Sequence, residues 1–185
     1  MTAEAVHYIT EQEYLEGEAR SEMKHEYVDG IVYARASASD PHELVSGNFF
    51  GALLNHLRGK GCRVFKSDMK VRMSFLEKPL YRYPDVFVAC DPADNHRLYR
   101  ERPKLLIEVL SNDWDDAALA KFIGYRAIST VEEIVFADPN VDAPVVYLSR
   151  RADGWEPVEI VRGMEAKFTL QSVALELGVA DLFAF

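Results

Sequence analysis

The sequence predicts a mixed α/β (α+β) domain with a central mixed sheet flanked by helices and extended by β-hairpins. Two near-continuous apolar runs, residues 84–90 and 104–110, are typical of central strands covered on both faces. A helical apolar period after residue 40 and an Asp-Gly pair at residues 29–30 predict a flanking helix and a hairpin. The length of 185 residues suits one domain, so we expect residues 1–185 to form a single domain.

The first part of the chain is expected to run helix, hairpin, helix. Residues 10–20 are predicted to form a short helix, with Thr10 as its N-cap and Glu13 completing a capping box. A hairpin follows over residues 23–36. Asp40 is expected to cap a long helix that begins with Pro41 and ends near Gly59. The apolar stripe of this helix consists of Val45, Phe49, Leu53 and Leu57, with Phe50 and Leu54 beside it.

The remainder is predicted to be mainly strands, with one long helix. Strands are expected over residues 62–66, 69–75, 84–90, 104–110 and 132–137. A helix is expected over residues 114–128, with Leu119, Phe122 and Ile123 facing the core. Residues 143–162 are predicted to form a second hairpin around Asp153-Gly154, and a short strand and helix lie near residues 178–183.

The charge of the chain is acidic overall but unevenly distributed. The formal net charge of −9 argues against a plain cationic binder of nucleic acid or membrane, because phosphate contacts need clustered lysine and arginine. Residues 1–40 hold nine acids and three bases, whereas residues 58–82 hold eight bases and two acids. This pattern predicts a basic rim, supplied by residues 58–82, around an acidic centre.

Targeting signals and cysteine chemistry point to an ordinary cytoplasmic protein. The first residues lack the basic and apolar segments of a signal peptide, and no apolar window is long enough for a membrane span. Cys62 and Cys90 do not form a CxxC motif and are expected to be buried free thiols. We therefore expect a cytoplasmic location and no membrane partner.

Two carboxylates occur where burial should disfavour them. Asp85 begins one apolar strand and Glu108 lies inside another, where an unpaired charge would cost several kcal/mol. Glu108 shares its face with Leu106 and Leu110, since strand side chains alternate. If the following helix packs back over the strand, Lys121 lies about 10 Å along it, level with Glu108. Lys121 is therefore predicted to reach Glu108.

An Asp, a Glu and a Lys in this arrangement suit metal-assisted phosphodiester hydrolysis. Carboxylate oxygens bind Mg²⁺, which activates water and offsets charge in the transition state, and a lysine can position the water or stabilise charge. The alternative is an ordinary buried Glu–Lys ion pair with Asp85 as a turn residue, and spacing leaves both interpretations open.

A resemblance to a known family favours the first interpretation. Pro84-Asp85 and Glu108-Val109-Leu110 resemble the PD-(D/E)xK signature of restriction-endonuclease-like nucleases, and the whole chain resembles the Uma2 family of that superfamily. The ordered set of matching segments carries the resemblance. They are Tyr14-Leu15, Glu26 to Gly30, Pro41-His42, Asp68, Val71-Arg72, Pro84-Asp85, Glu108 to Ser111, Lys121, Tyr125, Asp138-Pro139 and Asp181 to Phe183.

The resemblance implies a restriction-endonuclease-like core and a catalytic set of three residues. Asp85 and Glu108 would be the metal ligands for Mg²⁺ or Mn²⁺. The family's usual lysine position, two residues after the glutamate, is Leu110 in this chain. Uma2-like proteins share that departure and supply the lysine from the next helix, which here gives Lys121.

Six further residues are candidates for the site, each with a plainer alternative. Glu26 could complete the acidic site or be a solvated or Lys24-paired strand residue. His42 could contact phosphate or the metal shell, or lie on the surface near a helix cap. Asp68 could be an acidic group of the cleft or a turn residue. The last three, Lys70, Arg72 and Arg82, could bind nucleic-acid phosphates or form the solvated face of an edge strand.

Two functional hypotheses follow. The first is a Mg²⁺-dependent DNA endonuclease, which we expect to be a homodimer because cleavage of a duplex needs two sites. The second is a catalytically silent nuclease-fold protein that binds nucleic acid or protein, which the net charge and the missing lysine at position 110 favour. A nuclease acting on RNA or on damaged or branched DNA is a further possibility, since a fold does not fix function.

Overall fold

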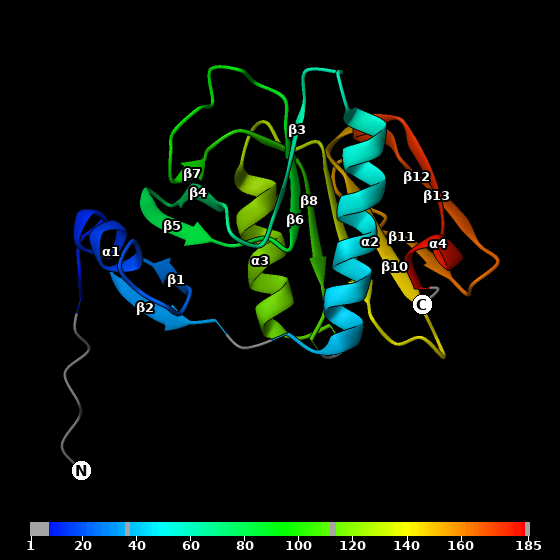
Figure 1. The fold of residues 1–185 in the computed structure, drawn as a ribbon, viewed down its shortest axis with the longest axis horizontal. Helices are drawn as coiled ribbons and strands as arrows, with labels where there is room; N and C mark the ends of the chain where they lie inside the picture. Colours follow the sequence, from blue (N-terminus) through cyan, green and yellow to red (C-terminus); the bar gives the residue numbers. More distant parts are fainter. Residues whose placement is uncertain (1–7, 36–37, 112–113, 184–185) are drawn as a thin grey trace, which may run out of the picture.

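Two sheets and the helices around them organise the computed structural model, which describes residues 8–35, 38–111 and 114–183 (Figure 1). The larger sheet has the order β11-β10-β9-β8-β6-β3, and its neighbours are antiparallel except for β8 and β9. Helix α3 connects this parallel pair, so β8, α3 and β9 form a crossover unit. The strands are β3 (Arg63–Lys66), β6 (Val86–Ala89), β8 (Pro103–Val109), β9 (Glu133–Asp138), β10 (Val145–Arg150) and β11 (Glu159–Arg162).

A second sheet of five strands has the order β2-β1-β5-β4-β7. Its strands are β1 (His25–Val28), β2 (Ile31–Ala34), β4 (Lys70–Phe75), β5 (Lys78–Arg82) and β7 (Tyr99–Arg100). A small C-terminal hairpin pairs β12 (Lys167–Leu170) with β13 (Leu175–Gly178). The helices are α1 (Glu11–Glu18), α2 (Asp40–Leu57), α3 (Asp116–Ala127) and α4 (Val179–Phe183), with short 3₁₀ turns η1 (Arg151–Asp153) and η2 (Gln171–Val173).

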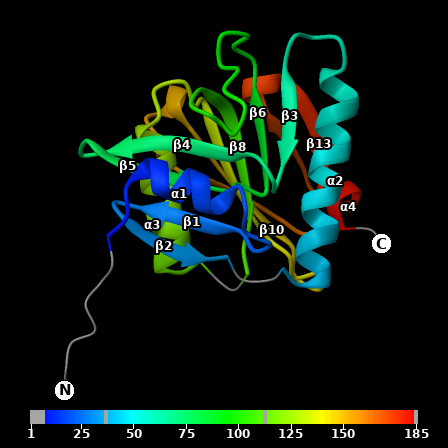
Figure 2. The same cartoon turned by 60° about the vertical axis from the view of Figure 1, so that its left-hand side comes forward.

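The two faces of the larger sheet pack against different helices (Figures 1 and 2). Helix α2 contacts β3, β6 and β8 on one face, and α4 packs beside it. Helix α3 contacts β9 on the other face and also β4 of the five-stranded sheet, so it lies between the two sheets. The alternation along β8 follows this division, because Ile107 packs in the α2 cluster and Leu106 in the α3 cluster. The sheet is therefore covered on both faces, as the apolar runs predicted.

Local signals at the N-terminal end are confirmed. Thr10 caps α1, and both hydrogen bonds of the capping box with Glu13 are present. Asp29 and Gly30 form the turn between β1 and β2 with φ of 49° and 88°, the positive values that this tight hairpin turn requires. A Cβ at Gly30 would lie 2.7 Å from the Tyr8 ring, so the turn needs glycine for space as well as conformation.

Two local expectations are wrong. Helix α2 takes Ser39 as its N-cap, and Asp40 is already helical. In α3, Leu119 and Ile123 are exposed, whereas Ala118 and Tyr125 are buried in the apolar cluster that the helix forms with strands of both sheets. Arg100 belongs to β7 and is buried over the Phe65 ring.

The two cysteines form a disulfide, which corrects the expectation of free thiols. Strands β3 and β6 pair antiparallel with Arg63 opposite Ala89, so one further step of the register brings Cys62 opposite Cys90. The pairing of these strands across 28 residues of chain is a tertiary feature that cysteine spacing does not reveal.

Reduction of this disulfide is expected to lower the stability of the fold. Closing a loop of 28 residues restricts the unfolded chain, and the loop-entropy relation gives about 3–4 kcal/mol. Urea unfolding with and without dithiothreitol measures the effect. A Cys62→Ala/Cys90→Ala double variant should be less stable and should not respond to the reductant. Equal stability of the oxidised and reduced protein would contradict the prediction.

None of the described helices is both long enough and apolar enough to cross a membrane.

Candidate active site

Asp85 and Glu108 lie opposite each other at one end of two paired strands. Val86 of β6 pairs with Ile107 of β8, and one more step of this antiparallel register places Asp85 across from Glu108. Both residues are almost fully buried, with 2% and 1% of their surface exposed. Two like charges directly opposite on a sheet repel each other, so this position requires cationic or hydrogen-bonding partners.

Asp85 has three such partners. Its Oδ1 pairs with the Arg35 guanidinium, and its Oδ2 lies 3.2 Å from His42 Nε2 and accepts a 2.8 Å hydrogen bond from the Val109 amide. Burial alone would raise the pKa of the Asp85 carboxyl, but His42, Arg35 and Val109 together hold that pKa below its usual value. Asp85 is therefore maintained as a buried carboxylate anion.

Glu108 is held by helix α3. Lys121 Nζ lies 2.7 Å from Glu108 Oε2, which confirms that the lysine reaches this glutamate. The Tyr125 hydroxyl, one turn further along the helix, donates a 2.5 Å hydrogen bond to Oε1. Burial and the nearby Asp85 charge raise the pKa of Glu108, against the opposing effect of Lys121. Burial lowers the pKa of Lys121, but Glu108 outweighs this effect and the pKa is raised, so the ammonium stays charged.

Tyr125 is a structural support of Glu108, and its replacement should destabilise the fold. Tyr125 is fully buried, so Tyr125→Phe would leave Glu108 Oε1 buried without its donor. An unsatisfied buried acceptor costs about 1–3 kcal/mol, and we expect a loss of unfolding free energy in that range. Chemical denaturation measures it, with the exposed Tyr33→Phe as the matched control. A loss no larger than that of the control would contradict this role.

A cavity of about 580 Å³ opens beside these groups. Its walls come from β1 and β2, the first turn of α2, the start of β6, the end of β8 and α3, and its polar lining includes Asp85, His42 and Lys121. A smaller cavity of about 90 Å³ is lined by Glu108 and Lys121, so the lysine lies between the two spaces. We refer to the larger cavity as the cleft.

Of the three further candidates Glu26, His42 and Asp68, the structure brings the first two to the cleft. Glu26 lines it and pairs with Arg82 at 2.6 Å, so the Lys24-paired alternative is wrong. His42 also lines the cleft and is buried, which excludes the surface alternative. Asp68 lies in the turn before β4, pairs with Lys24 and has a side chain that is 83% exposed.

The three basic candidates do not form an open phosphate track. Lys70 is 8% exposed and lies over the Tyr83 ring, and burial lowers its pKa. Arg72 pairs with Glu11 at 2.9 Å and with Glu101 at 2.8 Å. Arg82 is held by Glu26, and β4 has a neighbour on each side, so the edge-strand alternative also fails there.

Apart from Lys121, the cations of the cleft are different from those that the sequence predicted. Among the described lining residues they are Lys24, Arg35 and Lys121, and no base from residues 58–82 contributes. Arg35 was missed because its sequence neighbours show no motif, and it reaches Asp85 only through the pairing of β1 with β5. The one available signal was its place at the end of the predicted hairpin.

Mg²⁺ or Mn²⁺ fits the donor chemistry of Asp85 and Glu108. Magnesium typically takes one or two protein carboxylates and completes its octahedron with water and substrate phosphate. In the described part of the chain no cluster of three or more His, Cys, Asp or Glu side chains is arranged for a metal ion. Two carboxylates, and not a closed protein cage, would therefore hold such an ion, and in this structure each carboxylate oxygen accepts a hydrogen bond or ion pair.

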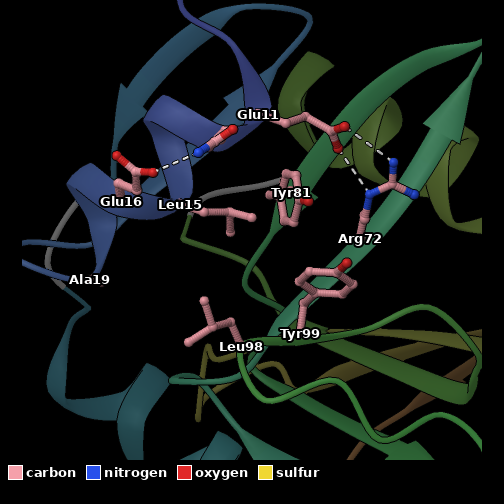
Figure 3. Close-up of a pocket in the computed structure, with 9 residues that line it drawn as sticks. Glu11, Leu15, Glu16, Ala19, Arg72, Tyr81, Leu98 and Tyr99 are labelled. Atoms are coloured by element: carbon pink, nitrogen blue, oxygen red, sulfur yellow. Dashed lines mark hydrogen bonds and ion pairs between the residues drawn. The ribbon is translucent and has the colours of Figure 1, made fainter.

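A further cavity, of about 450 Å³, lies away from the cleft, between α1 and strands β4, β5 and β7 (Figure 3). Figure 3 shows Glu11 extended toward Arg72 above an apolar floor of Leu15, Leu98 and Tyr99. Its only described cation, Arg72, is already paired with two glutamates, so this cavity does not offer the acid–lysine arrangement of the cleft.

Comparisons with known proteins identify the family of the chain and its fold. The Uma2 family model, described as "Putative restriction endonuclease", matches residues 11–180. Two uncharacterized proteins of Synechocystis sp. are similar in sequence. One, slr1290, is 38% identical over 104 residues, which are 56% of this chain and 54% of that protein. The other, sll1609, is 31% identical over 136 residues, which are 70% of this chain and 75% of that protein.

The chain thus spans about half the length of the first of these relatives. A crystal structure of "a putative nuclease belonging to DUF820" from Anabaena variabilis matches with a TM-score of 0.73 and 19% identity, over 95% of this chain and 98% of that one. At that identity the likeness concerns the fold, and it confirms the predicted mixed α/β (α+β) fold class. Since the family model covers nearly all of the described residues, the chain belongs to the Uma2 family of restriction-endonuclease-like proteins.

Proposed function

We propose that this protein is a divalent-metal-dependent endonuclease that hydrolyses phosphodiester bonds of DNA. The observation that carries the proposal is the convergence of two opposed, buried carboxylates and a charged lysine beside an open cleft. Perturbed titratable groups that meet in a cleft are typical of catalytic sites. Membership of the Uma2 family supports the same class of chemistry.

The residues of the chain divide the work in this proposal. Asp85 and Glu108 hold Mg²⁺ or Mn²⁺, which lowers the pKa of a water molecule and offsets charge on the reacting phosphate. The Lys121 ammonium positions the attacking water or stabilises charge on the phosphate oxygens. Val109 and Tyr125 fix the two carboxylates through hydrogen bonds to Oδ2 and Oε1, so neither must reorganise during the reaction.

A nicking assay tests this function. Supercoiled plasmid, single-stranded DNA, branched DNA and RNA are incubated with the protein in Mg²⁺, in Mn²⁺ and in a chelator. We expect metal-dependent cleavage of DNA at a level that a chelator abolishes. Cleavage of RNA or branched DNA alone would support the proposed phosphodiesterase activity but would change the proposed substrate. No cleavage of any substrate in either metal would contradict the proposal.

A second candidate is a catalytically silent member of the family that binds nucleic acid or protein. The observation that favours it is the full set of hydrogen bonds and ion pairs on the oxygens of Asp85 and Glu108, which leaves the site balanced without metal. Calorimetry discriminates the two candidates. The endonuclease should bind Mn²⁺ with an affinity that falls in Asp85→Asn and Glu108→Gln, whereas a silent protein should show no binding that depends on these residues.

The proposed assembly is a homodimer, because cleavage of both strands of a duplex needs two sites. Size-exclusion chromatography with light scattering measures the mass of the protein with and without duplex DNA. A monomer under both conditions, together with double-strand cleavage, would remove this part of the proposal.

A further inference from the structure

The position of Arg35 stands out among the groups of the cleft. Its guanidinium pairs with Asp85 Oδ1 through Nη2 and donates a 3.4 Å hydrogen bond from Nη1 to the Ser67 carbonyl. Its backbone amide donates to the Lys24 carbonyl at 2.9 Å, which fixes the main chain at the end of the β1–β2 hairpin. The side chain is 21% exposed and lines the cleft.

Three carboxylates act on the charge of this guanidinium, of which Asp85 is in direct contact. Burial lowers the pKa of Arg35, but the charges of Asp85, Glu108 and Glu26 outweigh burial and raise it. The three carboxylates come from separate strands of the chain, and β1 belongs to the other sheet from β6 and β8. Arg35 is therefore the cation at the place where acidic groups from both sheets meet.

The cations at this place already match or outnumber the carboxylates. Asp85, Glu108 and Glu26 carry three negative charges, and their ion-pair partners Arg35, Lys121 and Arg82 carry three positive charges. His42 also pairs with Asp85, which raises the pKa of the imidazole, and a protonated His42 adds a further positive charge. A divalent cation added to this set would leave an excess of at least two positive charges. Replacement of Arg35 by the cation would reduce that excess by one, and a substrate phosphate would reduce it further.

Distances also indicate that Arg35 and a metal ion cannot both bind the same oxygen of Asp85. Magnesium binds a carboxylate oxygen at about 2.0–2.1 Å, whereas a guanidinium nitrogen lies about 2.7–2.9 Å from its acceptor. Two cations on the same oxygen would lie close together in a buried setting and repel each other strongly. Asp85 Oδ2 already accepts bonds from His42 and Val109, so Oδ1 is the oxygen that a metal would need.

We propose that Arg35 holds the cation position of the site in the metal-free protein, that a divalent metal displaces it from Asp85, and that the released guanidinium binds a phosphate of the substrate. This inference rests on the proposed endonuclease function and assigns to Arg35 a role that the PD-(D/E)xK pattern does not contain. Guanidinium suits the second part, because its planar set of donors matches phosphate oxygens in pairs. The two parts are linked, since the side chain that leaves Asp85 already lines the cleft in which the substrate phosphate would bind.

Calorimetry with Mn²⁺ tests the competition. Arg35→Gln removes the competing charge, so we expect Mn²⁺ to bind at least about tenfold tighter than in the wild type. Arg82→Gln is the matched control, because it removes one positive charge from the same set of carboxylates but leaves the contact on Asp85 intact. The control should gain about threefold or less. Equal gains in both variants, or no gain in Arg35→Gln, would overturn the inference.

Binding of DNA tests the second part. In Ca²⁺, where cleavage is not expected, fluorescence anisotropy with a labelled oligonucleotide should show weaker binding by Arg35→Gln, by about fivefold or more. Arg35→Lys should recover part of the loss, because it restores charge without the paired donors. Unchanged DNA affinity in Arg35→Gln would overturn the role of Arg35 in phosphate binding.

The wild type provides a measurement that does not depend on folding of a variant. Nitrogen NMR of the arginine side chains, assigned with Arg35→Lys, should show the Arg35 signal moving when Mg²⁺ is added while the Arg82 signal stays. A stationary Arg35 signal in protein that binds metal would overturn this inference alone. If the wild type and Arg35→Gln both bind no metal through Asp85, the proposed metal-dependent function fails instead, so the two failures are distinguishable.

Discussion

Asp85→Asn is expected to reduce phosphodiester cleavage by at least about a thousandfold, because a bound metal contributes several kcal/mol of transition-state stabilisation. Asparagine keeps the size of the side chain and one oxygen acceptor, so the contacts with Arg35 or Val109 can persist in part. What it removes is the negative charge that holds the cation. Glu108→Gln should have an effect of the same order, since the two carboxylates act on one metal.

The control for Asp85→Asn lies at the other end of the same strand. Asp91 follows β6, pairs with Arg102 at 2.7 Å and does not line the cleft. Asp91→Asn should therefore retain wild-type nicking and metal affinity. Plasmid nicking and calorimetry should be measured on all three variants, with thermal melting to show that each is folded. Wild-type cleavage by a folded Asp85→Asn would remove Asp85 from the chemistry.

The parts of the fold that sequence predicted well are those decided by neighbouring residues. The capping box of Thr10 and Glu13 and the turn at Asp29-Gly30 depend on contacts within a few positions, and both are confirmed. The apolar stripe of α2 is likewise buried at Val45, where a helix lies on one face of a sheet. Local chemistry was sufficient there because no distant element competes with it.

The parts that sequence missed depend on distant pairing. Helix α3 buries Ala118 and Tyr125 against the two sheets and exposes Leu119, and the apolar period does not show which faces of the helix the sheets cover. Cys62 meets Cys90 only because β3 pairs with β6. Arg35 reaches Asp85 through the pairing of β1 with β5, and the 49 residues between Arg35 and Asp85 carry no periodic signal of that contact.

The candidate site shows the same division. The approach of Lys121 to Glu108 could be predicted, because a strand and the helix that follows it pack in a restricted way and the distances along each can be counted. The basic residues of 58–82 could not be placed, since charge counts give no side-chain direction. Lys70 is buried as a result of its position on β4, although its charge suggested a solvent-facing role.

Lys121→Met is expected to lower the free energy of unfolding by about 3 kcal/mol, at the lower end of the cost of breaking a buried ion pair. Glu108 is 1% exposed, and in this variant no cation would contact its Oε2. The carboxylate would then either stay charged and unpaired or take up a proton, and both outcomes cost free energy. The side chain of Lys121 is 23% exposed, and solvent therefore reduces the loss. Glu108→Gln alone should cost less, because the ammonium left behind can reach water.

The double variant Glu108→Gln/Lys121→Met separates stability from chemistry. Replacing both partners of a buried pair removes the uncompensated charge, so the double variant should recover most of the stability lost in Lys121→Met. Chemical denaturation of the wild type, both single variants and the double variant gives the coupling energy directly. A double variant as unstable as Lys121→Met would mean that packing of the lysine stem, and not its charge, stabilises the site.

Nicking should remain absent in the double variant, because the proposed water-positioning group and one metal ligand are both missing. Recovery of stability without recovery of cleavage would show that the buried Glu108–Lys121 pair is not needed to hold the fold together, and that its charges serve the reaction in the cleft.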